Sequence, residues 1–325
     1  MAAYDSGTEG LAAVARAALV REIDAEGVWA AEPVWREAFA EVPRHLFVPY
    51  YYVAGAHGYE RRWGESPDPA ARERWVRGAY EDVPLATRLR DGELLSSSSQ
   101  PSLMARMLVA LRVADGDRVL EIGAGTGYNA ALLAHRLGDD DLVTTVDVEP
   151  EISESARRHL AAAGYRPAVV TGDGARGVPE RAPYDRIIAT CALPSVPWAW
   201  VAQCREGARI LTPVATGLLA LTVRGGCAEG RFLPSGAFFV PLRGLPRPGA
   251  VAGDPAGVPS RAREDDSFQF LAELTRGVVS LREAYEVWAR EGMPGRERFG
   301  VSVEKDREWV WLDDREGPCV WPLPV

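Results

Sequence analysis

The stretch VLEIGAGTG, residues 119–127, decides the fold of this 325-residue chain. The strand pattern DRVLEI is followed by Gly123, Gly125 and Gly127, and then by the helical pattern YNAALLAHRL. Glycine permits a tight turn and lets a ligand approach the backbone closely. The helix beyond the turn offers free amide groups and the positive end of its dipole. The stretch therefore predicts a strand, a ligand-binding turn and a helix.

An aspartate that follows the turn by 20 residues indicates which class of ligand binds there. Asp147 ends the next predicted strand, LVTTVD, where a carboxylate can accept hydrogen bonds from two ribose hydroxyls. A nicotinamide motif GxGxxG is excluded because Tyr128 stands at its last position, and no GK[ST] phosphate loop is present. The pattern predicts a ribose-binding site of the S-adenosylmethionine type, with a tight turn that binds nothing as the alternative.

Strand and helix patterns alternate along the chain from Asp117 onward. LVTTVD, ISESARRHLAAA, PAVVTG, YDRIIAT and ARILTPV follow the glycine turn, and LLALTVR and GAFFVPL predict strands that finish the sheet. Such alternation is typical of a parallel sheet covered by helices on both faces. We expect an α/β fold, Rossmann-like, of the class I S-adenosylmethionine-dependent methyltransferases, with a doubly wound and mainly parallel sheet.

Composition and periodicity divide the chain into four predicted parts. Residues 1–95 are helical up to about residue 45 and irregular over 50–95, and we place them on the substrate side. Residues 96–242 form the cofactor-binding core, which opens with a helix near Gln100 or Pro101. Residues 243–262 are rich in proline, glycine and alanine and predict a linker. Residues 263–325 predict helices and a hairpin, FGVSVEKDREWVWL, and hence a small α+β C-terminal domain.

Composition limits the partners and the compartment. A formal net charge of −9 and a pI near 5.2 make nucleic acid an unexpected partner. The N-terminus lacks the pattern of a signal peptide and no apolar run is long enough to cross a membrane, so we expect a cytoplasmic protein. The four cysteines lie far apart, so we expect neither a disulfide framework nor a metal site.

Several segments beyond the glycine turn resemble protein-L-isoaspartate O-methyltransferases. The match covers about residues 33–242 and keeps the order of the family. It departs at Ser97 and Ser98, where the family has threonine and isoleucine, and we expect no counterpart in the ordinary repair enzyme for the last 80 or so residues. The matching segments are VPRHLFVP (42–49), SSSSQPSLMARML (96–108), VLEIGAGTGYNAALLA, GDGARG, APYDRIIAT, REGARILTPV and FFVPL (238–242).

The serine segment and the tail resemble a bacterial branch of this family. That branch accompanies ribosomally made, post-translationally modified peptides of the lanthipeptide, lasso-peptide, graspetide and FxLD types. The resemblance implies methylation of an aspartate in a precursor peptide that is already cyclised or modified, after which the ester closes to an aspartimide. The alternatives are a general isoaspartyl repair enzyme, a methyltransferase for a small carboxylate, and a binding protein without activity.

Methyl transfer to a carboxylate makes few chemical demands on a protein. A side-chain carboxyl with a pKa of about 3.9 is already ionised at neutral pH and needs no general base. Catalysis can rest on holding the attacking oxygen, the methyl carbon and the leaving sulfur in line. The absence of a catalytic triad from the sequence therefore agrees with this chemistry.

The resemblance assigns the candidate site residues. Ser99 matches the family serine before Gln-Pro and is expected to orient the substrate carboxylate, although it could instead cap the following helix. We expect Ser98 to assist it. The expected substrate-binding residues are Ser97, Gln100, His45, Thr190 and Val214, and the expected cofactor-binding residues are Glu121, Gly123, Gly125, Gly127, Asp147, Val148, Asp173 and Gly174.

Other residues leave two readings open. His45 could be structural, Asp173 could only form a turn, and Cys191 is expected to pack in the core. The tail could recognise the peptide or cover an edge of the catalytic domain. An aromatic set could wall a peptide groove or pack a long loop: Tyr50, Tyr51, Tyr52, Tyr59 and Trp63.

Overall fold

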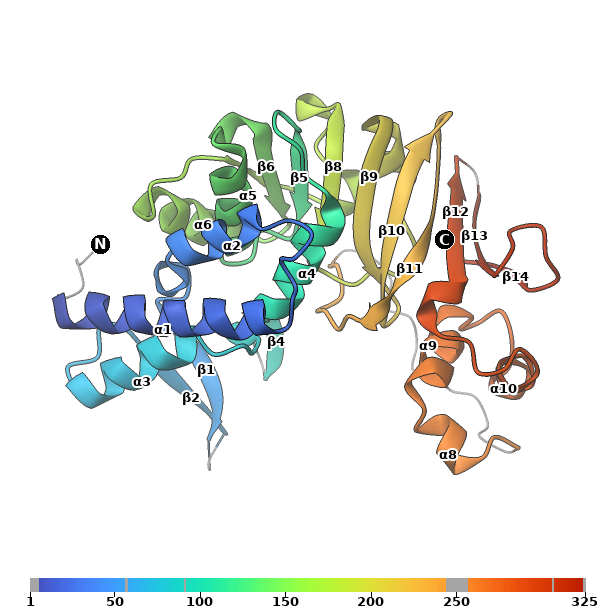
Figure 1. Cartoon of the computed structure of the whole chain (residues 1–325), viewed down its shortest axis with the longest axis horizontal. Helices are drawn as coiled ribbons and strands as arrows, with labels where there is room; N and C mark the ends of the chain where they lie inside the picture. The colour runs from blue at the N-terminus through green and yellow to red at the C-terminus, as the bar shows by residue number, and fades with distance from the viewer. Residues whose placement is uncertain (1–5, 56–57, 91, 244–256, 306, 324–325) are drawn as a thin grey trace. The chain divides into compact units, whose positions relative to one another are not determined.

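The computed structural model describes residues 6–55, 58–90, 92–243, 257–305 and 307–323 of the chain. Residues 244–256 of the predicted linker lie outside these ranges. The chain divides into two compact units, residues 1–173 and 174–325, which are described separately below (Figure 1). No helix among the described residues is long and apolar enough to cross a membrane.

The first unit begins with the predicted helices. α1 packs on α3 and α2 packs on α5. Trp35, Ala38 and Phe39 form the buried side of α2, which agrees with the helical structure predicted up to about residue 45. The helices are α1 (Ser6–Ala25) and α2 (Val34–Glu41), with a 3-10 turn η1 (Arg44–Leu46).

Residues 50–98 form an antiparallel sheet in the order β2-β1-β3-β4, so the expectation of an irregular region over 50–95 is wrong. Helix α3 interrupts these strands and begins with an Asp-Pro pair, a helix-start signal that can be recognised in the sequence. Asp68 caps the helix by accepting hydrogen bonds from Ala70 N (3.0 Å) and Ala71 N (3.2 Å). The elements are β1 (Tyr50–Gly55), β2 (Gly58–Trp63), α3 (Pro69–Ala79), β3 (Leu85–Arg90) and β4 (Glu93–Ser98).

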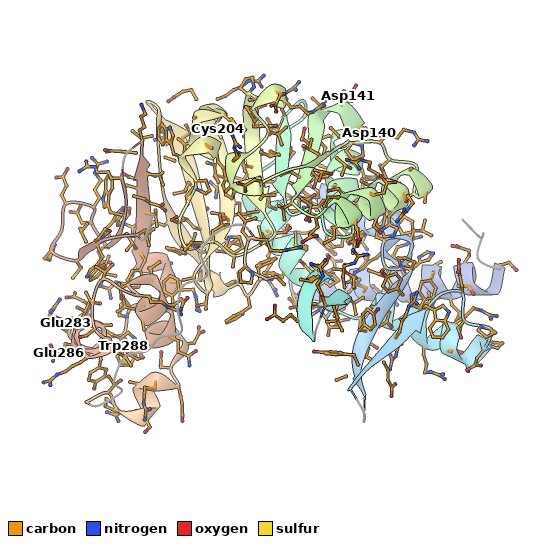
Figure 2. All side chains as sticks on the ribbon, turned by 180° about the vertical axis from the view of Figure 1, so that it is seen from behind. Asp140, Asp141, Cys204, Glu283, Glu286 and Trp288 are labelled. Atoms are coloured by element: carbon orange, nitrogen blue, oxygen red, sulfur yellow. The ribbon has the colours of Figure 1, made fainter. Side chains whose placement is uncertain are left out.

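The alternating part of the first unit carries the cofactor turn. Its strands run parallel, with Val119 opposite Val143 and Thr144 opposite Ala168. Asp140 and Asp141 lie in the short turn that leads into the middle strand (Figure 2). The elements are α4 (Pro101–Leu111), β5 (Val119–Ile122), α5 (Tyr128–Leu137), η2 (Asp140–Leu142), β6 (Val143–Asp147), α6 (Pro150–Ala162) and β7 (Ala168–Thr171).

The second unit continues with one parallel strand pair, β8 and β9, and then turns antiparallel from β9 through β11. The fold class is confirmed, and its sheet is mixed. The elements are η3 (Gly174–Arg176), η4 (Pro179–Arg181), β8 (Tyr184–Ala189), α7 (Trp198–Ala202), β9 (Cys204–Val214), β10 (Gly217–Arg224) and β11 (Cys227–Gly236).

The strand predicted over 236–242 is wrong, because β11 ends at Gly236. Gly225 and Gly226, at φ 57° and 74°, form the two-residue turn that folds β11 back on β10. A Gly-Gly pair between two apolar runs is the signal that sequence reasoning overlooked. The FFVPL segment forms an isolated parallel bridge at Pro241, in which Ala192 N donates to Val240 O at 3.0 Å and Leu242 N donates to Ala192 O at 2.8 Å.

The C-terminal segment contains the predicted helices and hairpin. β12 pairs antiparallel with β11, Val303 lying opposite Ala228, so its strands extend the sheet of the second unit. Trp288 packs toward α9, while Glu283 and Glu286 are exposed (Figure 2). The elements are α8 (Ser260–Arg263), α9 (Asp266–Leu274), α10 (Leu281–Arg290), η5 (Arg296–Arg298), β12 (Phe299–Glu304), β13 (Arg307–Leu312) and β14 (Val320–Pro322). The boundaries predicted at 95, 242 and 262 stay a prediction.

Candidate active site

The glycine turn leaves the carboxyl end of β5 and has the conformation that the sequence predicts. Gly123, Gly125 and Gly127 have φ values of 95°, 50° and 86°, in the left-handed region that side chains rarely adopt. A Cβ at Gly127 would lie 3.1 Å from Leu160 Cγ and 3.3 Å from Ala156 O of α6. Glycine is thus needed there both for its φ and for close packing of the turn against a helix.

Asp147 lies beside this turn, at the end of β6. Its carboxylate accepts hydrogen bonds from Gly125 N (3.3 Å) and Glu149 N (3.1 Å), and the residue is 8% exposed. Gly123 N donates to Val146 O at 2.8 Å, which ties the turn to the same strand. The acidic partner and the glycine turn therefore form one local unit, as the spacing predicts.

Glu121 is buried beneath the turn, with 1% of its surface exposed. Asn129 of α5 donates to its Oε1 at 2.8 Å. Burial raises the pKa of Glu121 to about 7, because an ionised carboxylate loses its hydration in the interior. Glu121 lies in β5, the strand that leads into the glycine turn. Its role in cofactor binding stays a prediction.

The serine segment lies directly against the glycine turn. A Cβ at Gly125 would lie 3.5 Å from Ser97 O and 3.9 Å from Ser96 Oγ. Ser96 Oγ in turn lies 3.3 Å from the hydroxyl of Thr87, its neighbour across β3 and β4. Strand β4 thus brings the predicted substrate segment to the predicted cofactor segment within one unit.

A buried arginine that the sequence analysis missed fixes the end of β4. Arg44 is fully buried, and its Nη2 donates to Ser98 Oγ (3.3 Å) and Ser99 O (3.1 Å). The same guanidinium donates to Ala79 O (2.9 Å) and Glu81 O (3.2 Å). Burial lowers the pKa of Arg44 to about 10, which leaves it charged at neutral pH. Ser98 is therefore an anchor for Arg44, and its assistance to Ser99 stays a prediction.

Ser99 does not cap helix α4. The amide of Ser102 donates to Asp82 Oδ1 at 2.7 Å instead, and Gln100 Nε2 donates to Asp82 Oδ2 at 3.0 Å. Within the described part of the chain, the Ser99 hydroxyl makes no hydrogen bond. That hydroxyl is consequently available to a ligand, whereas the Gln100 side chain is held by Asp82.

A cleft of about 360 Å³ opens beside the glycine turn. Gly125 and Thr126 form one part of its wall, and Ser96 and Tyr50 form another. His159 of α6 also lines it and lies 3.0 Å from Thr126 O through Nδ1. Burial lowers the pKa of His159, so the ring is neutral at pH 7. The remaining lining residues are Phe47, Pro49, Thr87, Arg88, Ile152 and Ser155.

His45 lies away from this cleft. Its ring is 1% exposed, with Nδ1 2.8 Å from Tyr80 Oη and Nε2 3.5 Å from Glu9 Oε1. Burial lowers the pKa of the imidazole. These contacts are those of a structural residue, so the geometry lends substrate contact by His45 no support.

The other predicted residues are less informative. Val148 and Asp173 are exposed next to strand ends in the first unit. In the second unit, Gly174 O accepts from Trp200 Nε1 at 2.8 Å, and Val214 is 1% exposed. Thr190 follows β8 and is half-buried. Their cofactor or substrate roles stay predictions, and Cys191, at 8% exposed, is buried as expected.

The residues present fit S-adenosylmethionine. The glycine turn has no side chains to cover its backbone at Gly123, Gly125 and Gly127, and Asp147 places a carboxylate beside it at the end of β6. The cleft is lined by Gly125 of this turn and by Ser96 of β4. No group of three or more His, Cys, Asp or Glu side chains within the described ranges could hold a metal ion. Together with the sheet, these features define a class I S-adenosylmethionine-dependent methyltransferase.

Comparison with known proteins specifies the family. Residues 69–225 match the family model Protein-L-isoaspartate(D-aspartate) O-methyltransferase (PCMT). The protein-L-isoaspartate O-methyltransferase of Hyperthermus butylicus is 35% identical over 244 residues, covering 71% of this chain and 89% of the relative. That of Aeropyrum pernix is 36% identical over 237 residues, covering 71% and 80%. The chain belongs to the protein-L-isoaspartate O-methyltransferase family, whose members are S-adenosylmethionine-dependent carboxyl methyltransferases.

Solved structures agree on the fold. A protein-L-isoaspartate O-methyltransferase matches with a TM-score of 0.62 at 23% identity, over 92% of this chain and 100% of its own. A putative one from Plasmodium falciparum, in complex with S-adenosyl-L-homocysteine, matches with a TM-score of 0.53 at 14% identity, over 70% and 97%. Coverage of 92% reaches beyond residue 242, so the expectation that the tail has no counterpart in such an enzyme is wrong.

Proposed function

We propose that this chain methylates the free carboxylate of L-isoaspartyl residues in peptides or proteins. The observation that carries the proposal is the placement of β4 against the cofactor turn, with Ser97 O 3.5 Å from the Cβ position of Gly125. The names of the relatives at 35% and 36% identity support the same substrate. A carboxylate held at the end of β4 would lie beside a cofactor held on the glycine turn.

The chemistry asks the protein mainly to position its reactants. When bound, S-adenosylmethionine supplies an electrophilic methyl group on a sulfonium. Ser99 donates a hydrogen bond to one carboxylate oxygen and leaves the other to attack. Asp147 would accept hydrogen bonds from the ribose hydroxyls of the bound cofactor and so help to fix the position of its sulfonium. Such alignment can supply roughly 7–11 kcal/mol of the barrier lowering.

A second candidate is methylation of an ordinary aspartate in a ribosomally made, modified peptide, with closure of the ester to an aspartimide. Ser97 and Ser98 favour it, because they stand where the family has threonine and isoleucine. The tail no longer favours it, because a solved protein-L-isoaspartate O-methyltransferase covers 92% of the chain.

Mass spectrometry separates the two candidates. The protein is incubated with S-adenosylmethionine and either a linear isoaspartyl peptide or a cyclised peptide that contains an ordinary aspartate. The repair function predicts methyl ester on the first peptide only. Ester or aspartimide on the second peptide alone would contradict it and support the second candidate.

The Ser99→Ala variant tests the site itself. Its turnover should fall while its affinity for S-adenosylhomocysteine stays at the wild-type value, because the hydroxyl acts on the substrate. Ser235→Ala, at an exposed position of β11, is the control for the loss of a serine hydroxyl. A loss of cofactor affinity in Ser99→Ala would show that the assigned role is wrong.

A further inference from the structure

The hairpin of β1 and β2 presents two different faces (Figure 1). One face packs on α3: Tyr51 Oη donates to Trp75 O at 3.1 Å, and a Cβ at Gly78 would lie 3.7 Å from Arg62 Nη1. Tyr51 and Arg62 are opposite each other in the strand register. Residues on the other parity must therefore point away from α3.

That second face is aromatic and carries one arginine. The Arg61 guanidinium lies 4.4 Å from the ring centroid of Tyr50 and 5.8 Å from that of Trp63. The rings of Tyr50 and Tyr52 meet edge to face at 6.1 Å. We call this set the aromatic face; it consists of Tyr50, Tyr52, Tyr59, Arg61 and Trp63.

The β2 part of the aromatic face is open to solvent, whereas Tyr50 and Tyr52 of β1 are half-buried. Tyr59 is 59% exposed and Trp63 is 37% exposed. Large side chains left in water at one place typically mark a binding surface. The contrast within the chain is sharp, since four other tryptophans are at most 2% exposed: Trp29, Trp35, Trp75 and Trp200.

The face is continuous with the cleft. Tyr50 belongs to both, because it stacks with Arg61 and lines the cleft together with Ser96 and Gly125. The cleft, about 360 Å³ with the open space at its mouth included, is too small to hold a cofactor and a peptide segment together. The peptide residues on either side of the methylated carboxylate must therefore lie outside the cleft. The aromatic face is the surface next to the cleft, because Tyr50 belongs to both.

Charge indicates which peptides the face would bind. Within the described part of the chain, Arg61 makes no ion pair, and its contacts are with the rings of Tyr50 and Trp63. The whole chain carries a net charge of −9, so an uncompensated arginine on an aromatic surface is a local site for anionic groups. A guanidinium also binds carboxylates with two parallel hydrogen bonds.

We propose that the aromatic face docks the peptide segment next to the methylated residue, with an acidic side chain of that peptide on Arg61 and its neighbours on Tyr52 and Trp63. The proposal rests on the proposed function for its substrate class. It adds a selectivity for peptides with acidic flanks that the catalytic residues do not supply.

The test compares Arg61→Gln and Trp63→Ala with wild type on two isoaspartyl peptides, one with glutamates and one with glutamines on both sides. Arg74→Gln is the matched control, because Arg74 is an exposed arginine on α3, away from the aromatic face. For the acidic peptide, KM should rise about tenfold in Arg61→Gln and Trp63→Ala, with kcat unchanged. For the neutral peptide, Arg61→Gln should have no effect.

A binding measurement separates failure of this inference from failure of the proposed function. Fluorescence anisotropy of the labelled acidic peptide, with S-adenosylhomocysteine present, reports docking even if wild type methylates neither peptide. Variants that bind as tightly as Arg74→Gln would overturn the docking surface. A fall in kcat at constant KM would also overturn it, because the face would then act on the reaction and not on binding.

Discussion

At the scale of single residues, Arg44 organises the candidate substrate segment although it does not line the cleft. Its five hydrogen bonds reach the carbonyl at the end of α3 and two carbonyls of the loop that follows, as well as Ser98 Oγ and Ser99 O. The segment that ends in the predicted substrate serine is thereby held to residues 79–83. We therefore predict that Arg44 is a positioning residue, because its contacts are with Ser98 and Ser99 and not with the cleft.

Arg44→Lys should lower the free energy of unfolding by roughly 3 kcal/mol or more, since each bond to a charged donor contributes about 1.5–3 kcal/mol and lysine cannot reach all the acceptors. Urea denaturation measures the change. Arg136→Lys is the control: Arg136 bonds Val113 O at 3.0 Å and exposed Asp115, away from β4. Equal losses in both variants would contradict a special role for Arg44.

Asp147→Ala should weaken binding of S-adenosylhomocysteine by roughly 1.5–3 kcal/mol, because it removes the acceptor for the ribose. It also removes the acceptor for Gly125 N, which acts in the same direction. Calorimetry measures the affinity. Asp139→Ala removes a carboxylate that accepts from Asp141 N at 3.0 Å in the turn before β6, and this variant should bind as wild type does. Unchanged affinity in Asp147→Ala would refute the ribose assignment.

At the scale of elements, the glycine turn shows how conformation and packing combine. Gly127 and Gly138 flank the same helix, α5, with φ values of 86° and 65°. A Cβ at Gly127 meets Leu160 Cγ at 3.1 Å, whereas nothing lies within 4 Å of a Cβ at Gly138. A side chain at either position would therefore destabilise the protein through its unfavourable backbone conformation. At Gly127 it would also clash with α6.

Gly138→Ala should cost roughly 1–2 kcal/mol of stability, the usual penalty of the left-handed region. Gly127→Ala should cost more, because α6 must also move away, and it should reduce affinity for S-adenosylhomocysteine. Thermal unfolding with and without the ligand measures both effects. Equal stability losses would mean that packing against α6 does not constrain the turn.

At the scale of the whole molecule, the C-terminal strands are bound into the second unit. Phe270 of α9 lies 4.9 Å from Phe232 of β11 and 5.4 Å from Phe299 of β12, ring centre to ring centre. Glu308 of β13 accepts from Val196 N at 2.9 Å, which fixes the loop after β8. These contacts support the interpretation that the tail covers an edge of the catalytic domain, which was the alternative to peptide recognition.

Glu308 should make stability depend on pH. Burial raises its pKa from 4.5 to about 8, so the folded protein keeps a proton that the unfolded chain has already lost. The free energy of unfolding therefore falls as pH rises through that window. Glu308→Gln keeps an acceptor for Val196 N and should reduce the fall between about pH 5 and pH 8 by on the order of 3 kcal/mol.

Denaturant titrations at both ends of this pH range measure the difference. Glu304→Gln, at an exposed position of β12 paired with Arg307, should leave the pH dependence as it is in wild type. If Glu308→Gln loses stability with pH as steeply as Glu304→Gln does, the buried carboxyl is not the source of the effect.

The sequence by itself determined the local structure of the candidate cofactor site, because the signals for the glycine turn and Asp147 lie close together in the chain. Three glycines at alternate positions require a turn, and the spacing to Asp147 spans one strand–helix–strand unit, so both could be read without the rest of the chain. The helices over 1–45 and the tail elements were readable for the same reason: their apolar periodicity is a property of a few neighbouring residues.

Only the tertiary structure decided what depends on distant residues. Tyr50 and Tyr51 are adjacent and identical in type, yet one lines the cleft and the other packs on α3, because strand alternation and the position of a helix assign their faces. Arg44 meets Ser99 across 55 positions, and Glu308 meets Val196 across 112. No local pattern encodes such pairs, because they form only when folding buries a charged group and makes it find partners.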